Sequence, residues 1–173
     1  MMNNSLKPVA LIAELRRWVG TLEVPPNKGQ LVERWQKTVD GIAQGESWCM
    51  AFVQHHITWI DKLFWELSAN PYYTKVFKSE HCLTVWNKTP KEMRSNVPVL
   101  GSIAIWQHKG TASGHTGIVS SILPSQRKFL CIEGNTGPGD GVVREGDGVF
   151  EKSRSMDGAG EMKLLGFIVT WPL

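Results

Sequence analysis

The segment GESWCMAF, residues 45–52, places Cys49 directly after a glycine–glutamate–serine run that is typical of a helix start. From Ser47 onward, apolar residues recur every three or four positions until Asn70 and Pro71 interrupt the pattern, so we predict a long helix there. With Ser47 as the N-cap, Cys49 lies in the first turn, where free backbone N–H groups and the helix dipole stabilise a thiolate. A buried core residue, a metal ligand and half of a disulfide are the other interpretations of this thiol.

The periodicity of the chain changes near Pro98. Before this point, helical spacing predicts one helix over Pro8–Val19 and another over residues 31–39. After it, the runs GSIAIWQ, HTGIVSSIL, KFLCIEGN and KLLGFIVTW are rich in β-branched and aromatic residues and are separated by turn residues, which predicts antiparallel strands. Helices followed by strands favour the α+β class. Residues 134–148 are rich in glycine and predict a long loop, either on the open surface or at the rim of a cleft.

Length and composition indicate a single domain over residues 1–173, with residues 1–7 as a flexible N-terminus. The 19 Lys and Arg residues against 16 Asp and Glu give a net charge of +3, which is no footprint of nucleic-acid binding. No stretch approaches the ~20 apolar residues of a membrane span, and the N-terminal apolar patch is shorter than the core of a secretory signal. We expect a monomer, made in the cytoplasm without a signal peptide, that neither binds nucleic acid nor inserts into a membrane.

A cysteine nucleophile needs a histidine within hydrogen-bond reach and a further group that orients the histidine. His55 and His56 follow Cys49 by six and seven residues, about 10 Å along the predicted helix, which is too far for a hydrogen bond. His81 and His108 stand in polar or weakly patterned segments and are expected to be surface residues.

His115 stands between glycines in SGHTGIV, at the start of a predicted strand, and is the best candidate for the base. The next strand ends in EGN, which puts Glu133 and Asn135 at alternate positions and therefore on one face. We expect Ile122 to lie opposite Lys128 across the loop LPSQR, in which case His115 faces Asn135. A shift of one residue in this register would send the base and its orienting groups to opposite faces.

The motifs WCMAFV, GHTGIV and EGNT, in this order and with helices before strands, resemble those of the CHAP amidase family. The family consists of papain-like peptidoglycan hydrolases that are common in phage lysins and bacterial cell-wall enzymes, and the resemblance covers roughly residues 8–173. It implies that Cys49 is the nucleophile, His115 the base, and Glu133 with Asn135 the orienting groups. It also implies a papain-like α+β fold, with N-terminal helices packed on an antiparallel sheet and the nucleophile at a helix N-terminus.

Two further residues are candidates for substrate binding. Trp48 neighbours the nucleophile and either walls the cleft or belongs to the core, while Asn27 lies in VPPNKG, within an upstream segment that resembles one subgroup of the family. The alternative role of Asn27 is the turn before the second helix. Some family members bind calcium through an aspartate-rich loop before the cysteine, but VDGIAQGESWC offers only Asp40 and Glu46. We therefore expect neither a metal nor another cofactor.

These observations predict a cysteine amidohydrolase or peptidase that cleaves an amide bond of peptidoglycan by acyl transfer. The bond is either the muramoyl–alanine link, as in N-acetylmuramoyl-L-alanine amidases, or a link within the peptide stem or cross-link, as in endopeptidases. Such a protein acts on the cell wall after release or export. Two alternatives stay open, namely a non-catalytic module that binds the wall and a cysteine protease or effector that cuts a protein amide.

Overall fold

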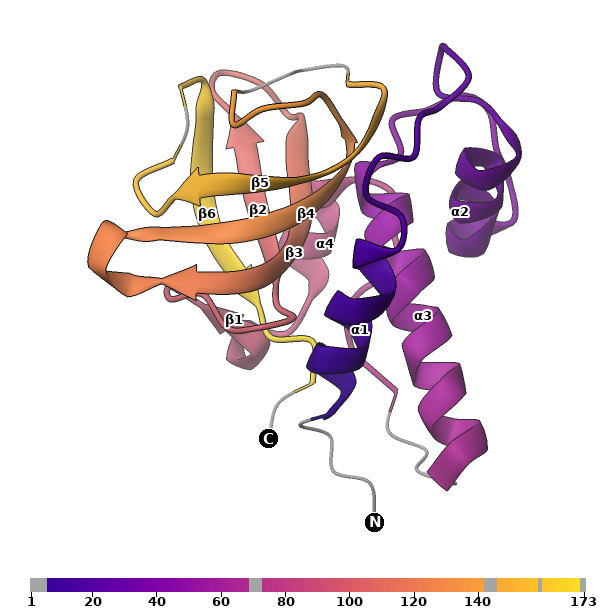
Figure 1. Cartoon of the computed structure of the whole chain (residues 1–173), viewed down its shortest axis with the longest axis horizontal. Coiled ribbons are helices and arrows are strands. Elements are labelled where there is room, and N and C mark those ends of the chain that lie inside the picture. The colour runs from indigo at the N-terminus through magenta and orange to yellow at the C-terminus, as the bar shows by residue number, and fades with distance from the viewer. Residues whose placement is uncertain (1–5, 69–72, 142–145, 159, 172–173) are drawn as a thin grey trace.

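The structure is a computed structural model and describes residues 6–68, 73–141, 146–158 and 160–171. It has the α+β arrangement expected from the sequence, with helices grouped beside an antiparallel sheet (Figure 1). The helices are α1 (Leu6–Arg16), α2 (Gln30–Asp40), α3 (Cys49–Ser68) and the short α4 (Cys82–Lys88), with 3-10 turns η1 (Lys91–Met93) and η2 (Pro124–Gln126). In the described part of the chain, no helix combines the length and the apolar character needed to cross a bilayer.

The sheet has six strands in the order β1-β6-β2-β3-β4-β5, and every neighbouring pair is antiparallel. The strands are β1 (Arg94–Ser95), β2 (Ile103–His108), β3 (Gly114–Leu123), β4 (Lys128–Thr136), β5 (Gly148–Ser155) and β6 (Met162–Ile168). In Figure 1, β4 and β5 run across the view in front of β2 and β6, so the sheet is strongly curved. Its two faces therefore border two different groups of buried side chains.

Strand β2 shows how both faces of the sheet are buried. Ile103 and Ile105 face the larger core, which they share with α1 and α3. Ala104 and Trp106 alternate with them and face a smaller core between the curved strands, together with Phe129 from β4. Because neither face meets solvent, the strand has a continuous apolar run and not the alternation of a half-exposed strand.

Helix α3 is held most firmly at its N-terminal end. Met50, Ala51, Phe52 and Val53 are completely buried, whereas Leu67 near the other end is 62% exposed. The first turn of α3 thus lies inside the larger core, so its backbone has little room to shift.

The N-terminal helix begins earlier than the sequence predicts. Leu6 and Lys7, which sequence analysis assigns to a flexible terminus, are part of α1, and the helix ends at Arg16, before the predicted Val19. Lys7 is fully buried, and its Nζ donates a hydrogen bond of 2.8 Å to Asp61 on α3. A buried lysine needs such a partner, and this pairing is long-range, so helical periodicity does not reveal it. Residues 1–5 lie outside the described part of the chain.

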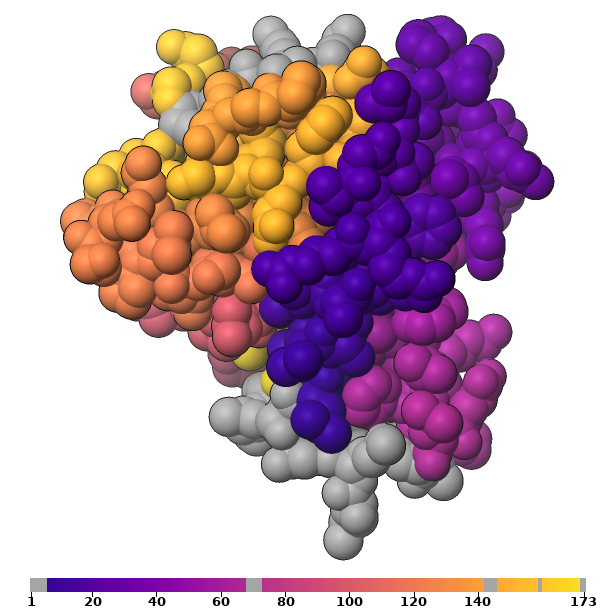
Figure 2. All heavy atoms as spheres, viewed as in Figure 1, coloured from indigo at the N-terminus to yellow at the C-terminus, as the bar shows by residue number. Residues whose placement is uncertain are grey.

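The segment between α1 and α2 crosses from the helices to the sheet. Figure 2 shows this indigo part of the chain packed directly against the orange atoms of the sheet. Leu22 forms an isolated bridge with Gly148 of β5, and Arg16 at the end of α1 forms an ion pair with Glu151. These contacts fasten the edge strand β5 to the helical side of the molecule.

The hairpin of β3 and β4 does not have the expected register at its turn. Ile122 pairs with Phe129 and not with Lys128, because the connection is one residue shorter than expected. A β-bulge at Ser120 then shifts the pairing by one residue, so that Ile118 faces Ile132, as the predicted register requires. The prediction was therefore wrong near the turn and correct at the end of the hairpin that carries the candidate base.

Candidate active site

Cys49 is the first residue of α3 and is 5% exposed. The N–H of Phe52 donates to the carbonyl of Trp48, so the N-cap is Trp48 and not Ser47, as the sequence suggested. The thiol nevertheless lies in the first turn, where the N–H groups have no partner in the helix. A hydrogen bond from the Met50 backbone is one of the influences that lower the pKa of Cys49.

His115, at the start of β3, is bonded to Glu133 on β4. The distance from His115 Nε2 to Glu133 Oε2 is 2.9 Å, and both side chains are buried. Because a carboxylate only accepts hydrogen bonds, Nε2 donates here, and Nδ1 is the ring nitrogen that remains for the thiol. A Cβ on Gly117 would lie 2.6 Å from Cγ of Glu133, so a glycine at this position leaves the space that the carboxylate occupies.

Arg154 on β5 completes this line of buried polar groups. Its Nε donates to Glu133 Oε1 at 2.6 Å and its Nη2 donates to Glu133 Oε2, giving a two-pronged ion pair in which both side chains are at most 1% exposed. The guanidinium also lies 5.7 Å from the ring centre of Trp106. Arg154 therefore holds both oxygens of the carboxylate, including Oε2, which also accepts from His115.

Sequence analysis missed Arg154. The only hint in the sequence is weak: two cations alternate along a strand, on the face that is buried. Lys152 and Arg154 are two residues apart on β5 and both are buried, which is unusual for cations in a strand. The Nζ of Lys152 donates to the carbonyls of Gly137 and Gly141, in the loop after β4. From β5, the strand next to β4, Arg154 thus holds Glu133 and Lys152 holds the loop that follows β4.

The charges of the site favour a thiolate beside an imidazolium. A hydrogen bond with Cys82 is the largest influence that lowers the pKa of Cys49; burial opposes it, and His115 adds a further lowering. Burial by itself would lower the pKa of His115, but hydrogen bonds with Cys49 and Glu133 raise it to about 9. Burial would likewise raise the pKa of Glu133, and the hydrogen bonds from Arg154 and His115 outweigh it, so that this pKa is lowered. The site can therefore hold a reactive thiolate at neutral pH.

A second thiol lies beside the first. Cys82, the first residue of α4, has its Sγ 3.7 Å from Sγ of Cys49, and none of the three cysteines forms a disulfide. The hydrogen bond with Cys49 and burial raise the pKa of Cys82, so it is the proton-bearing member of the pair. Cys131 lies among the side chains of the smaller core. The two thiols are 33 residues apart in the sequence and come together only in the folded chain.

An open cleft of about 520 Å³ leads to the two thiols. Its lining residues come from the loop before α3, the start of α4 and the loop before β3: Glu46, Ser47, Cys49, Glu80, His81, Cys82, Ala112, Ser113 and Gly114. The cleft is acidic on one side. Burial, followed by repulsion from Glu46 and Asp40, raises the pKa of Glu80 to about 7.

The structure places Trp48 in the core instead of on the cleft wall. Its side chain is completely buried, its Nε1 donates to Glu23 at 2.6 Å, and its ring packs on Trp35 and Phe52. It therefore has no surface with which to contact a substrate.

Asn27 is not among the residues that line the cleft. Its Nδ2 donates to the carbonyl of Gly45 at 3.1 Å, and its backbone has a positive φ of 52°. Asn27 thus supports the loop that leads to the nucleophile, in keeping with the turn role that the sequence also allowed.

Asn135 lies in a second β-bulge, between the pairs Glu133–Phe150 and Thr136–Gly148. Its φ is 54°, and no hydrogen bond between Asn135 and His115 is present among the described residues. Its Oδ1 is buried and lacks a partner within the described part of the structure. Of the two orienting groups that the sequence offers, Glu133 is the one that is hydrogen-bonded to the imidazole in the described structure.

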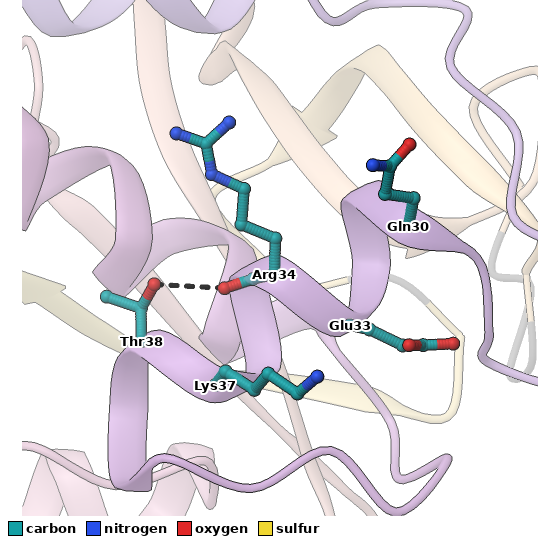
Figure 3. A pocket seen from close by; sticks show the side chains of 5 residues that line it. All are labelled: Gln30, Glu33, Arg34, Lys37 and Thr38. Carbon is teal, nitrogen blue, oxygen red and sulfur yellow. Dashed lines mark hydrogen bonds between the residues drawn. The ribbon is translucent and has the colours of Figure 1, made fainter.

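A separate hollow lies on α2 and shares no lining residue with the cleft at the thiols. Its side chains come from a single helix: Gln30, Glu33, Arg34, Lys37 and Thr38 (Figure 3). In Figure 3 Glu33 and Lys37 extend to one side while Arg34 points away from them, so the three charges do not converge on one point. This hollow has no arrangement that would perform chemistry.

Comparison with known proteins identifies the family. The family model described as CHAP domain matches residues 41–135, a range that includes Cys49, His115, Glu133 and Asn135. No curated protein and no solved structure matches the chain. In the described residues, no three His, Cys, Asp or Glu side chains gather as ligands for a metal ion. Since the match covers more than half of the 173 residues, the chain belongs to the CHAP domain family.

Proposed function

We propose that this protein is a cysteine hydrolase that cleaves an amide bond of peptidoglycan by acyl transfer. CHAP domains are in general peptidoglycan hydrolases with amidase or peptidase activity. The observation that carries the finer proposal is the buried line of Cys49, His115, Glu133 and Arg154, which begins in the open cleft. A nucleophile at a helix N-terminus facing a base on the neighbouring sheet also supports a papain-like arrangement.

In the proposed reaction, the thiolate of Cys49 attacks the carbonyl carbon of the substrate amide. Backbone N–H groups at the start of α3, including that of Cys49, stabilise the oxyanion. His115 donates its proton to the leaving amine and then accepts a proton from the water that hydrolyses the thioester. Glu133 keeps the ring in place and stabilises its charge, and Arg154 keeps Glu133 ionised and positioned.

The charges of the site favour a hydrolase over a module that only binds peptidoglycan. A module that only held peptidoglycan would gain nothing from a buried Glu133–Arg154 pair aimed at an imidazole, because desolvating two charges is costly. A site that must hold an imidazolium next to a thiolate does need such a pair. The pKa of His115, about 9, corresponds to that need.

The test is digestion of purified peptidoglycan by the purified protein, with mass spectrometry of the released fragments. New muramoyl lactyl ends would identify an amidase, and new peptide ends would identify an endopeptidase. Cys49→Ala should abolish release, while Cys131→Ala serves as the thiol control and should at most slow release, because Cys131 lies outside the cleft but its thiol contacts Glu133. Binding of intact peptidoglycan without any released fragment would contradict the proposal and favour a non-catalytic module. Cleavage of proteins but not of peptidoglycan would favour a protease.

A further inference from the structure

Two thiols share the cleft, and the proposed reaction uses only one of them. Cys49 and Cys82 are 5% and 4% exposed, both line the cleft, and their sulfur atoms are 3.7 Å apart. They belong to different elements, since each begins its own helix. This arrangement places a second thiol beside the proposed nucleophile.

We propose that Cys82 is a resolving thiol, which traps peroxide-oxidised Cys49 as an intramolecular disulfide and so switches the enzyme off reversibly. The inference rests on the proposed function only in that Cys49 is taken as the nucleophile. Formation of the disulfide itself depends on the contact between the two sulfurs and not on the substrate.

The chemistry requires one peroxide per protein. The Cys49 thiolate attacks one oxygen of hydrogen peroxide, forming a sulfenic acid and releasing hydroxide. The Cys82 sulfur then attacks the sulfenic sulfur, the S–O bond breaks, and the oxygen leaves as water after taking up the Cys82 proton. The two sulfurs together lose two electrons, and the peroxide is reduced to one hydroxide ion and one molecule of water. A small dithiol reverses the change by thiol–disulfide exchange.

The local structure allows the sulfurs to meet. They must approach each other by roughly 1.7 Å to reach the ~2.05 Å of a disulfide bond. Both thiols border the larger core, but α3 is the longer helix and residues 50–53 in its first turns are completely buried, so we expect Cys82 to move more. Cys82 begins a helix of only seven residues, and residues 73–81 before it contain neither helix nor strand. A Cβ on Gly114 would lie 3.0 Å from Cβ of Cys82, so glycine there leaves space beside the resolving thiol.

The third cysteine does not compete for this role. Cys131 is completely buried, packs in the smaller core, and is absent from the cleft lining. Burial raises its pKa well above that of a free thiol. A peroxide that enters the cleft therefore meets Cys49 and Cys82 but not Cys131.

The experiment treats wild type, Cys82→Ala and Cys131→Ala with excess hydrogen peroxide, and then with dithiothreitol. Peptide mapping without reduction should show a Cys49–Cys82 linked peptide in wild type and in Cys131→Ala. Wild type should lose its wall lysis and recover it with dithiothreitol. In Cys82→Ala, Cys49 should proceed to the sulfinic acid, so that lysis, relative to the untreated variant, does not return.

Two results would overturn the proposal. One is sulfinic acid at Cys49 in wild type with no linked peptide; the other is full recovery of Cys82→Ala after the same treatment. The readouts also separate this inference from the proposed function. A linked peptide in a protein that never lyses walls would support the disulfide and contradict the proposed hydrolase activity. A protein that lyses walls, but loses this activity irreversibly after peroxide, would support the hydrolase and contradict the disulfide.

Discussion

Replacing Glu133 by glutamine tests the buried line of the site, because it removes a charge while almost preserving shape. Glu133 accepts hydrogen bonds from His115 and from two nitrogens of Arg154, and neither Glu133 nor Arg154 is exposed by more than 1%. Breaking such a buried pair typically costs about 3–5 kcal/mol, since the remaining charge loses its partner. Glutamine retains one acceptor oxygen, so we expect a loss of about 3 kcal/mol in the free energy of unfolding.

The same change should slow catalysis by a separate route. An amide can still accept a hydrogen bond from His115, but it does not stabilise the imidazolium charge. In Ser-His-Asp enzymes the equivalent change costs about 10⁴-fold in kcat, and a thiolate–imidazolium pair depends less on this support. We expect a decrease of about 10²-fold or more for Glu133→Gln, and a smaller one for Asn135→Ala, because in the described structure the ring is hydrogen-bonded to Glu133 and not to Asn135.

A double variant separates the two effects. Adding Arg154→Met to Glu133→Gln removes the stranded cation, so stability measured by urea unfolding should recover, while the rate of wall lysis should not. Glu151→Gln is the matched control, since it is the same chemical change on the neighbouring strand β5, at a side chain that is 27% exposed and pairs with the exposed Arg16. A Glu133→Gln protein with the wild-type rate, beside a folded but inactive Asn135→Ala, would refute the assignment and make Asn135 the orienting residue.

Three further predictions concern pH and metal. Lysis should decline as pH rises through about 9, where His115 loses the proton that it gives to the leaving amine, and a rate that keeps rising beyond this pH would contradict its role. The pKa of Glu80 is raised from 4.5 to about 7, so wild type should lose stability as pH rises between these values. Glu80→Gln should remove that loss, which unfolding curves at pH 4 and pH 8 would detect as a stabilisation confined to pH 8. Wall lysis should continue in the presence of EDTA, because the carboxylates of Asp40 and Glu46 already accept backbone hydrogen bonds. Loss of lysis on chelation, restored by calcium alone, would show a metal requirement.

The elements of the fold were largely predictable because they depend on local patterns. Helical spacing located α2 to within one residue at each end and the start of α3 to within two, and the runs of β-branched residues identified four of the strands. The start of α1 was missed, because Lys7 is held by Asp61, 54 residues further along the chain. Periodicity contains no information on a partner so distant.

In the candidate site, too, residues in local motifs were predictable, whereas residues that act through long-range contacts were not. Cys49, His115 and Glu133 stand in short motifs with recognisable chemistry, and the structure brings them together. Arg154 and Cys82 were missed, because each acts on a residue 21 or 33 positions away, across a strand pairing or a helix contact. The register of the hairpin depended on a bulge that a single serine introduces, and no alternation of apolar residues marks it.

The contacts of Asp61 have a consequence for the connectivity of the chain. Its Oδ1 accepts hydrogen bonds of 2.8 Å from Lys7 in α1 and from Trp171, which follows the last strand, so the two ends of the described chain meet at one carboxylate. The Lys7 ammonium also lies 5.6 Å from the ring centre of Trp171. A short linker could therefore join the ends, and new termini could be opened in the connection between β3 and β4, which contains no buried residue from Pro124 to Gln126. In such a circular permutant β4, with Glu133, and β3, with His115, would lie at opposite ends of the chain, yet the same carboxylate would still hold the joined segment in place.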